Sequence, residues 1–157
     1  MKAGYRFFTT WVFDSPCEPV WQAILDIDRW PEWWRGVEVV EQLEKGDDGG
    51  VGCVYRNRWR SVLPYTVGFT LRTTQVEPRR FLEAEATGQL EGVGRWRFYE
   101  GPGTAVTYEW LVRTTPAWMN LLTPVARPIF AWSHNVVMRW GGESLARHLG
   151  ARLLART

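Results

Sequence analysis

The sequence predicts an α+β protein in which one curved antiparallel sheet wraps around a long C-terminal helix. Three observations carry this prediction. Apolar and polar residues alternate over most of residues 5–114, as is typical of strands. Turn-forming residues separate these segments, most clearly Gly-Asp-Asp-Gly-Gly at residues 46–50. Over residues 128–154 the apolar spacing becomes that of an amphipathic helix, whose long apolar face requires a broad cover.

The chain opens with a predicted strand over residues 5–13, followed by two short helical segments. Both faces of this strand are fairly apolar, so we expect both to be covered. Ser15-Pro16 favours a helix start, and the apolar spacing predicts a helix over residues 18–26. The tryptophans and proline of residues 28–34 then indicate a rigid corner, which either closes one end of the core or contacts a ligand.

Six further strands are predicted, which makes seven in all. They cover residues 37–44, 51–60, 65–72, 82–88, 92–100 and 106–113. Their charged residues fall on the outer face, where arginines and glutamates on neighbouring strands should form a ladder of ion pairs. The fourth of these strands carries Ala84, Ala86 and Gly88 on its inner face, so either a bulky neighbour or a ligand must fill the space above it.

The C-terminal helix has three notable features. Pro124 and Pro128 predict that it is kinked or restarts near its beginning. Gly141 is costly inside a helix, and we expect it to open a pocket over the small residues of the sheet. A second apolar stripe, formed by Trp132, Val136 and Trp140, predicts a homodimer contact or a cover from residues 118–122.

The composition limits the functional classes to which the chain can belong. The 157 residues fit one domain spanning residues 1–157, and 11 tryptophans are available for a core or a flat apolar site. A net charge of +2 without a basic tail gives nucleic-acid binding little support. The chain lacks a long apolar run and a signal-peptide pattern, which predicts a cytoplasmic protein. Cys17 and Cys53 are expected to be buried and reduced, and no metal-ligand set or cofactor motif is recognised, so neither a metal nor a cofactor is predicted.

Four stretches together resemble one known family. They are Ser15-Pro16 with Val20-Trp21; Trp30-Pro31-Glu32-Trp33 before Val37-Glu38; Gly92-Val93-Gly94-Arg95-Trp96 followed by Thr104-Ala105-Val106-Thr107-Tyr108; and His134-Asn135 before Met138-Arg139. In order and spacing the chain is similar to the polyketide cyclase/dehydrase and lipid-transport family of the START-like (SRPBCC) superfamily. This resemblance implies a helix-grip fold, with a cavity between sheet and helix for a lipid, a polyketide, an isoprenoid or a similar apolar molecule.

The inward positions of the predicted strands and helix supply the candidate site. His134, Tyr108 and Tyr55 are the candidate catalytic groups, because a neutral imidazole can move a proton and a tyrosine hydroxyl can stabilise an enolate. The predicted ligand-binding residues are Tyr55, Asn57, Trp59, Phe69, Ala84, Ala86, Trp96, Phe98, Tyr108, Trp110, His134, Val137, Met138 and Gly141.

Three functions remain open on this evidence. The first is a binding protein that holds a hydrophobic small molecule without chemistry of its own. The second is an enzyme of the aromatase, cyclase or dehydratase type, in which a pocket His or Tyr acts as acid or base. The third is a protein-interaction module. The buried polar groups can also simply satisfy one another at the edge of an aromatic core, which is their usual role.

Overall fold

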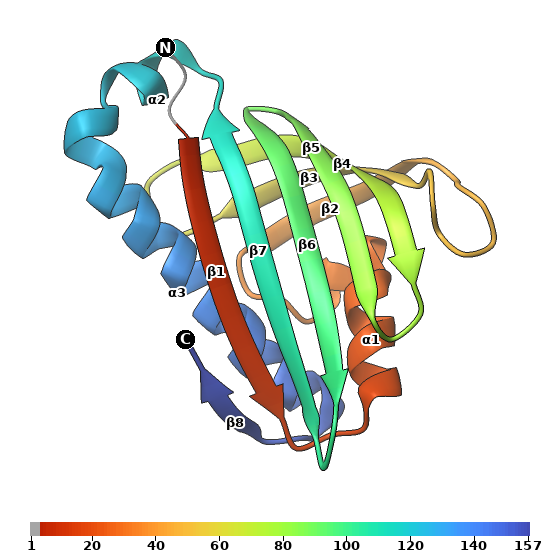
Figure 1. Cartoon of the computed structure of the whole chain (residues 1–157). Helices are drawn as coiled ribbons and strands as arrows, with labels where there is room; N and C mark the ends of the chain where they lie inside the picture. The colour runs from red at the N-terminus through yellow and green to blue at the C-terminus, as the bar shows by residue number, and fades with distance from the viewer. Residues whose placement is uncertain (1–3) are drawn as a thin grey trace.

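One antiparallel sheet curves around a long C-terminal helix in the computed structural model, which describes residues 4–157 (Figure 1). The predicted architecture is therefore confirmed. The strands are β1 (Gly4–Phe13), β2 (Val37–Glu44), β3 (Val54–Arg60), β4 (Thr66–Glu77), β5 (Phe81–Gly88), β6 (Leu90–Glu100), β7 (Thr104–Thr114) and β8 (Leu153–Arg156). Their order across the sheet is β2-β3-β4-β5-β6-β7-β1-β8.

The helical elements lie at three places. Helix α1 (Cys17–Leu25) and the 3-10 helix η1 (Ile27–Glu32) connect β1 to β2, and α2 (Ala117–Leu121) leads into α3 (Thr123–Leu149). The long helix restarts at Thr123, so Pro124 occupies its first turn while Pro128 lies within it. The N-cap residue of α2 is Pro116, and the hydroxyl of the preceding Thr115 donates to the Gly88 carbonyl over 2.6 Å.

The C-terminus corrects the predicted strand count from seven to eight. We expected the helix to run to residue 154, but it ends at Leu149, where Gly150 adopts φ +65°. Glycine adopts this left-handed conformation without strain, which makes it a common helix terminator. The chain then reverses, and β8 pairs antiparallel with β1, with Trp11 opposite Arg156.

The outer face of the sheet carries the predicted ladder of ion pairs. Arg95 lies between Glu83 and Glu109, at 2.9 Å and 3.2 Å from their carboxylate oxygens. Our expectation that both faces of the first strand are covered is wrong. Phe8 points outward and is 60% exposed, because none of the helices and strands within residues 4–157 packs on that side of β1.

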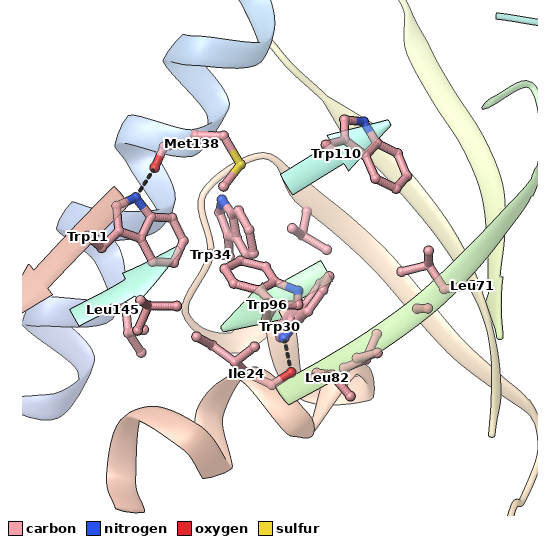
Figure 2. Close-up of a cluster of buried hydrophobic side chains, with 14 of the residues drawn as sticks. Trp11, Ile24, Trp30, Trp34, Leu71, Leu82, Trp96, Trp110, Met138 and Leu145 are labelled. Atoms are coloured by element: carbon pink, nitrogen blue, oxygen red, sulfur yellow. Dashed lines mark hydrogen bonds between the residues drawn. The ribbon is translucent and has the colours of Figure 1, made fainter. Parts of the chain in front are cut away.

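Tryptophan rings fill the space beneath the second half of α3. The Trp34 indole Nε1 donates to the Val137 carbonyl over 3.0 Å, and the Trp11 Nε1 donates to the Met138 carbonyl over 3.1 Å. Figure 2 shows both rings beside the helix, together with Trp30 and Trp96. The two carbonyls precede Gly141 and Gly142 by one helical turn, so each indole lies against a glycine.

Gly141 therefore has a different role from the predicted one. A Cβ atom at Gly141 would lie 2.6 Å from Cε2 of Trp34, so this glycine makes room for an indole and does not open a ligand pocket over Ala84 and Ala86. Gly142 does the same for Trp11, whose Nε1 would lie 2.9 Å from a Cβ atom there. The cost of both glycines in a helix is explained by close packing.

Both cysteines are buried and reduced, as predicted. Cys17 begins α1, and its thiol lies 3.8 Å from the Arg79 carbonyl. The Cys53 sulfur accepts the backbone N–H of Gly46 over 3.2 Å and so holds the turn before β3. These contacts give both thiols a structural role in the fold.

Candidate functional site

A cavity of about 160 Å³ lies between the sheet and the first half of α3. An engineered cavity of about 150 Å³ is known to hold a benzene molecule, so this space suits a compact ligand. The wall is mainly aromatic and aliphatic. It consists of Tyr5, Phe7, Trp30, Trp34, Trp59, Ser61, Leu63, Tyr65, Val67, Phe69, Leu71, Leu90, Trp96, Tyr108, Trp110, Val112, Thr114, Met119, Phe130, Ser133, His134, Val137 and Met138.

The structure brings part of the predicted set together. The predicted residues that reach the cavity wall are Trp59, Phe69, Trp96, Tyr108, Trp110, His134, Val137 and Met138. The predicted residues outside the wall are Tyr55, Asn57, Ala84, Ala86, Phe98 and Gly141. These six are all buried, so the inward side of each strand was identified correctly, but an inward position can face solid core as well as open space.

Asn57 and Tyr55 belong to that solid core. Asn57 is only 1% exposed, and its Nδ2 donates to the Tyr55 carbonyl over 3.1 Å. Its Oδ1 accepts the Trp59 indole N–H over 3.3 Å. Asn57 is thus satisfied by its own strand and is not directed at the cavity. Burial raises the pKa of Tyr55 well above its usual range, so its hydroxyl stays protonated.

The tryptophan corner has the first of the two roles that the sequence left open, and its contact with a ligand stays a prediction. Trp30 and Trp34 close one end of the core, and both also line the cavity. The Trp30 Nε1 donates to the Ile24 carbonyl over 3.1 Å, which fixes the ring against the end of α1 (Figure 2). Since Pro31 lies within η1, the turn that presents these rings is stiff.

Other wall residues were not predicted as ligand contacts. Tyr5 and Phe7 come from the inward face of β1, and Met119 and Phe130 come from α2 and the start of α3. The alternation of β1 had already placed Tyr5 and Phe7 on one face. Their position at the cavity depends on the pairing of β1 with β7, which aligns Phe7 with Trp110, and this pairing has no local signature in the sequence.

His134 lies in the cavity wall and stacks on Phe7, with ring centroids 3.9 Å apart. Its Nδ1 is buried and has no hydrogen-bond partner within the described chain. Burial lowers the pKa of His134 to about 4, against a smaller opposing effect of the Asn135 side chain. The imidazole is therefore neutral near pH 7.

Tyr108 provides a hydroxyl in the same wall. Its ring stacks on Trp96, with centroids 4.0 Å apart. A Cβ atom at Gly94 would lie 2.5 Å from this hydroxyl, so the glycine on the neighbouring strand makes room for it. Burial raises the pKa of Tyr108 far above its usual range, which keeps the hydroxyl protonated and able to donate a hydrogen bond.

Further polar groups lie around the first turns of α3. The hydroxyl of Ser133 donates to that of Ser61 over 2.5 Å, and Thr114 donates to Asn120 over 2.8 Å. The Tyr5 hydroxyl is buried, with no partner among residues 4–157. Of these polar residues, the ones that line the cavity are Tyr5, Ser61, Thr114 and Ser133, and all four are uncharged. As formed by residues 4–157, the wall contains no Asp, Glu, Lys or Arg.

The three residues of the second apolar stripe of α3 differ in how far they are buried. Val136 is buried, and Trp140 is half-buried with the Arg35 guanidinium 4.2 Å from its ring centre. Only Trp132 is well exposed, at 54%. The expected cover from residues 118–122 is wrong, because Trp118 packs on Tyr65 instead, with ring centroids 5.2 Å apart.

The described residues contain neither a metal-binding cluster nor a membrane-spanning helix. Within residues 4–157, no three His, Cys, Asp or Glu side chains are grouped so that they could hold a metal ion. None of the helices in this range is both long and apolar enough to cross a membrane.

Comparison with known proteins gives consistent results. A family model described as polyketide cyclase / dehydrase and lipid transport matches residues 14–139. The solved structure of the Zhui aromatase/cyclase from Streptomyces sp. R1128 is similar, with a TM-score of 0.74 at 16% identity over 94% of each chain. A START superfamily protein from Mycobacterium smegmatis has a TM-score of 0.70 at 12% identity, covering 95% of this chain and 97% of that chain.

A third similar structure is the di-domain ARO/CYC BexL from the BE-7585A biosynthetic pathway. Its TM-score is 0.69 at 18% identity, and the match covers 90% of this chain and 50% of the di-domain chain. No curated protein matches the sequence. Identities this low show a shared fold and leave the activity open.

Proposed function

This chain belongs to the polyketide cyclase/dehydrase and lipid-transport family, and we propose that it holds an uncharged, largely apolar small molecule in the cavity beneath the first half of α3. The observation that carries the proposal is the cavity wall formed by residues 4–157, which combines many aromatic rings with a few uncharged polar groups and contains no carboxylate, lysine or arginine side chain. Such walls are typical of small-molecule sites, where a few polar groups orient an apolar ligand.

The wall also defines which ligands are excluded. A carboxylate or ammonium group loses its hydration on entering an apolar cavity, and none of the described wall residues carries an opposite charge to compensate. A hydroxyl or carbonyl group carries a smaller desolvation cost, which the Tyr108 hydroxyl or the His134 ring can offset by a hydrogen bond. The favoured ligand is thus a flat or compact hydrophobic molecule bearing an uncharged oxygen group.

A cyclase or dehydratase is the second candidate, because His134 lines the cavity and is not sealed in solid core. Its chemistry is constrained by the environment of the ring. A group whose pKa is about 4 is a weak base near neutral pH, whereas efficient general bases have a pKa close to the working pH. The same neutral imidazole is well suited to hydrogen bonding, so we favour binding over proton transfer.

The decisive experiment is a calorimetric titration with a matched pair of probes near pH 7. We expect 2-naphthol, which is uncharged, to bind at least about tenfold more tightly than 2-naphthoate, which has the same two rings and a carboxylate. Native mass spectrometry of the purified protein would show whether a ligand from the host cell already occupies the cavity.

Two variants separate cavity binding from surface binding. Val67→Phe adds a ring to the cavity wall and should abolish naphthol binding, whereas Val39→Phe places the same ring on the exposed part of edge strand β2 and should leave it unchanged. Equal affinity for naphthol and naphthoate, or naphthol binding that survives Val67→Phe, would contradict the proposal. Turnover of a polyketide-like substrate that is lost in His134→Phe would instead support the cyclase.

A further inference from the structure

The largest cluster of exposed apolar side chains lies on α2 and the first half of α3. We call it the apolar patch and define it as Trp118, Leu121, Leu122, Val125, Ile129 and Trp132. Leu121 is 82% exposed and Val125 is 79% exposed, the highest values among the large hydrophobic residues of the described chain. Figure 1 shows these two elements beyond the edge of the sheet, near the beginning of β1.

The spacing of the patch places it on one side of the helix. Leu122, Val125, Ile129 and Trp132 follow at intervals of three or four residues, which aligns them along α3. The cavity-lining residues Phe130 and His134 face the sheet, so the patch is not part of the cavity wall. Soluble proteins rarely expose a contiguous apolar surface of this kind unless it contacts something.

Charge distinguishes this surface from the rest of the molecule. Residues 114–142 contain no Asp or Glu but two arginines, whereas most arginines of the sheet pair with a glutamate. Arg139 is exposed, has no carboxylate partner among residues 4–157, and follows Trp132 by seven residues, which places it on the same side of α3. Arg127 also lacks a carboxylate partner there and lies 4.5 Å from the Tyr5 ring centre.

We propose that the apolar patch docks on the surface of an anionic phospholipid bilayer, with Arg139 contacting the headgroups. Helices that lie in the membrane interface combine tryptophan and leucine on their apolar face with arginine or lysine on their polar face. The acid within one helical turn of Arg139 in the sequence is Glu143, which pairs with Arg156. Tryptophan in particular favours the level of the headgroups, and Trp118 and Trp132 stand near the two ends of the patch. Docking would bring the end of the cavity that is lined by Met119 and Phe130 close to the lipid.

The test is vesicle flotation without added ligand, which keeps it independent of what the cavity binds. We expect the wild-type protein to float with vesicles of phosphatidylglycerol and phosphatidylcholine, and to bind phosphatidylcholine vesicles at least tenfold more weakly. Binding to the anionic vesicles should weaken as salt rises, because salt screens the arginine charge. Arg139→Ser should reduce the preference for anionic vesicles.

Leu121→Ser combined with Val125→Ser is the central variant. Both side chains are so exposed that the unfolding midpoint should not change, while the partition coefficient should fall at least tenfold. Val39→Ser with Leu43→Ser is the matched control, since these residues are also exposed but lie on β2 among glutamates. It should bind vesicles as the wild-type protein does.

Three results would overturn the proposal. The wild-type protein could fail to bind either type of vesicle, or the Leu121→Ser, Val125→Ser protein could bind as well as wild type. Light scattering could also show a wild-type dimer that the same double substitution converts to a monomer. That last result would assign the apolar patch to contact between two copies of this chain.

Discussion

Gly141→Ala tests whether the second half of α3 is held by its contact with Trp34. Helix propensity alone predicts that this substitution stabilises the protein by about 1 kcal/mol. The structure predicts the opposite, because the new Cβ would lie 2.6–2.7 Å from three atoms of the Trp34 indole. Trp34 is 2% exposed and packs against Trp11, Trp30 and Trp59, so its ring can move only by disturbing these contacts or by entering the cavity that it lines.

The expected loss of stability follows from two destabilising contributions that oppose the gain in helix propensity. Overpacking a core costs about 1–3 kcal/mol, and displacing the indole from the Val137 carbonyl would leave a buried N–H unpaired, at about 1–3 kcal/mol. After the propensity gain, we expect Gly141→Ala to lower the free energy of unfolding by about 2 kcal/mol, or the melting temperature by about 4–8 °C. Gly142→Ala should cost less, because its closest contact to Trp11 is 2.9 Å.

Urea unfolding followed by far-ultraviolet circular dichroism measures these differences. A double-mutant cycle with Trp34→Phe isolates the contact, since phenylalanine lacks the indole nitrogen that the new methyl group approaches. We expect Gly141→Ala to cost less in the Trp34→Phe background than in the wild type. A Gly141→Ala protein that is more stable than wild type would refute the reasoning.

Two further predictions concern titratable groups. The free energy of unfolding should fall by about 2 kcal/mol between pH 7 and pH 5, because His134 has the ordinary pKa of 6.5 in the unfolded chain and a pKa of about 4 in the native protein. Urea unfolding at both pH values should show a smaller loss of stability in His134→Phe than in the wild type. An equal loss would contradict the prediction. Burial raises the pKa of Cys17 to about 11. This thiol should therefore react with Ellman's reagent only after the protein unfolds. Rapid labelling of Cys17 in the native protein would contradict the prediction, because it would show that the surroundings of this thiol open.

The strands and their inward faces were predictable because alternation is a local signal. The outer arginines of β3 and the inward Phe69 and Leu71 of β4 lie where the period of two places them. The end of α3 was misjudged because the apolar spacing continues past Gly150 into β8, and spacing alone does not distinguish the last helical turn from the first residues of a strand.

The cavity was predicted in kind but not in extent. Its position under the first half of α3 depends on how far the tryptophan rings fill the space under the second half, and ring packing is a property of the assembled fold. Gly141 shows the limit most clearly. The sequence indicated that something approaches this glycine closely, but it did not identify the Trp34 indole, which comes from residues far away in the chain.

The most direct test of the account is a nuclear magnetic resonance measurement of contacts between 2-naphthol and methyl groups of the protein. We predict nuclear Overhauser effects from the naphthol rings to the methyl groups of Met138, Val137 and Val112, which line the cavity from opposite sides. Contacts confined to exposed methyl groups such as those of Leu121 and Val125, or an absence of contacts at saturating naphthol, would contradict the claim that this cavity is a ligand site.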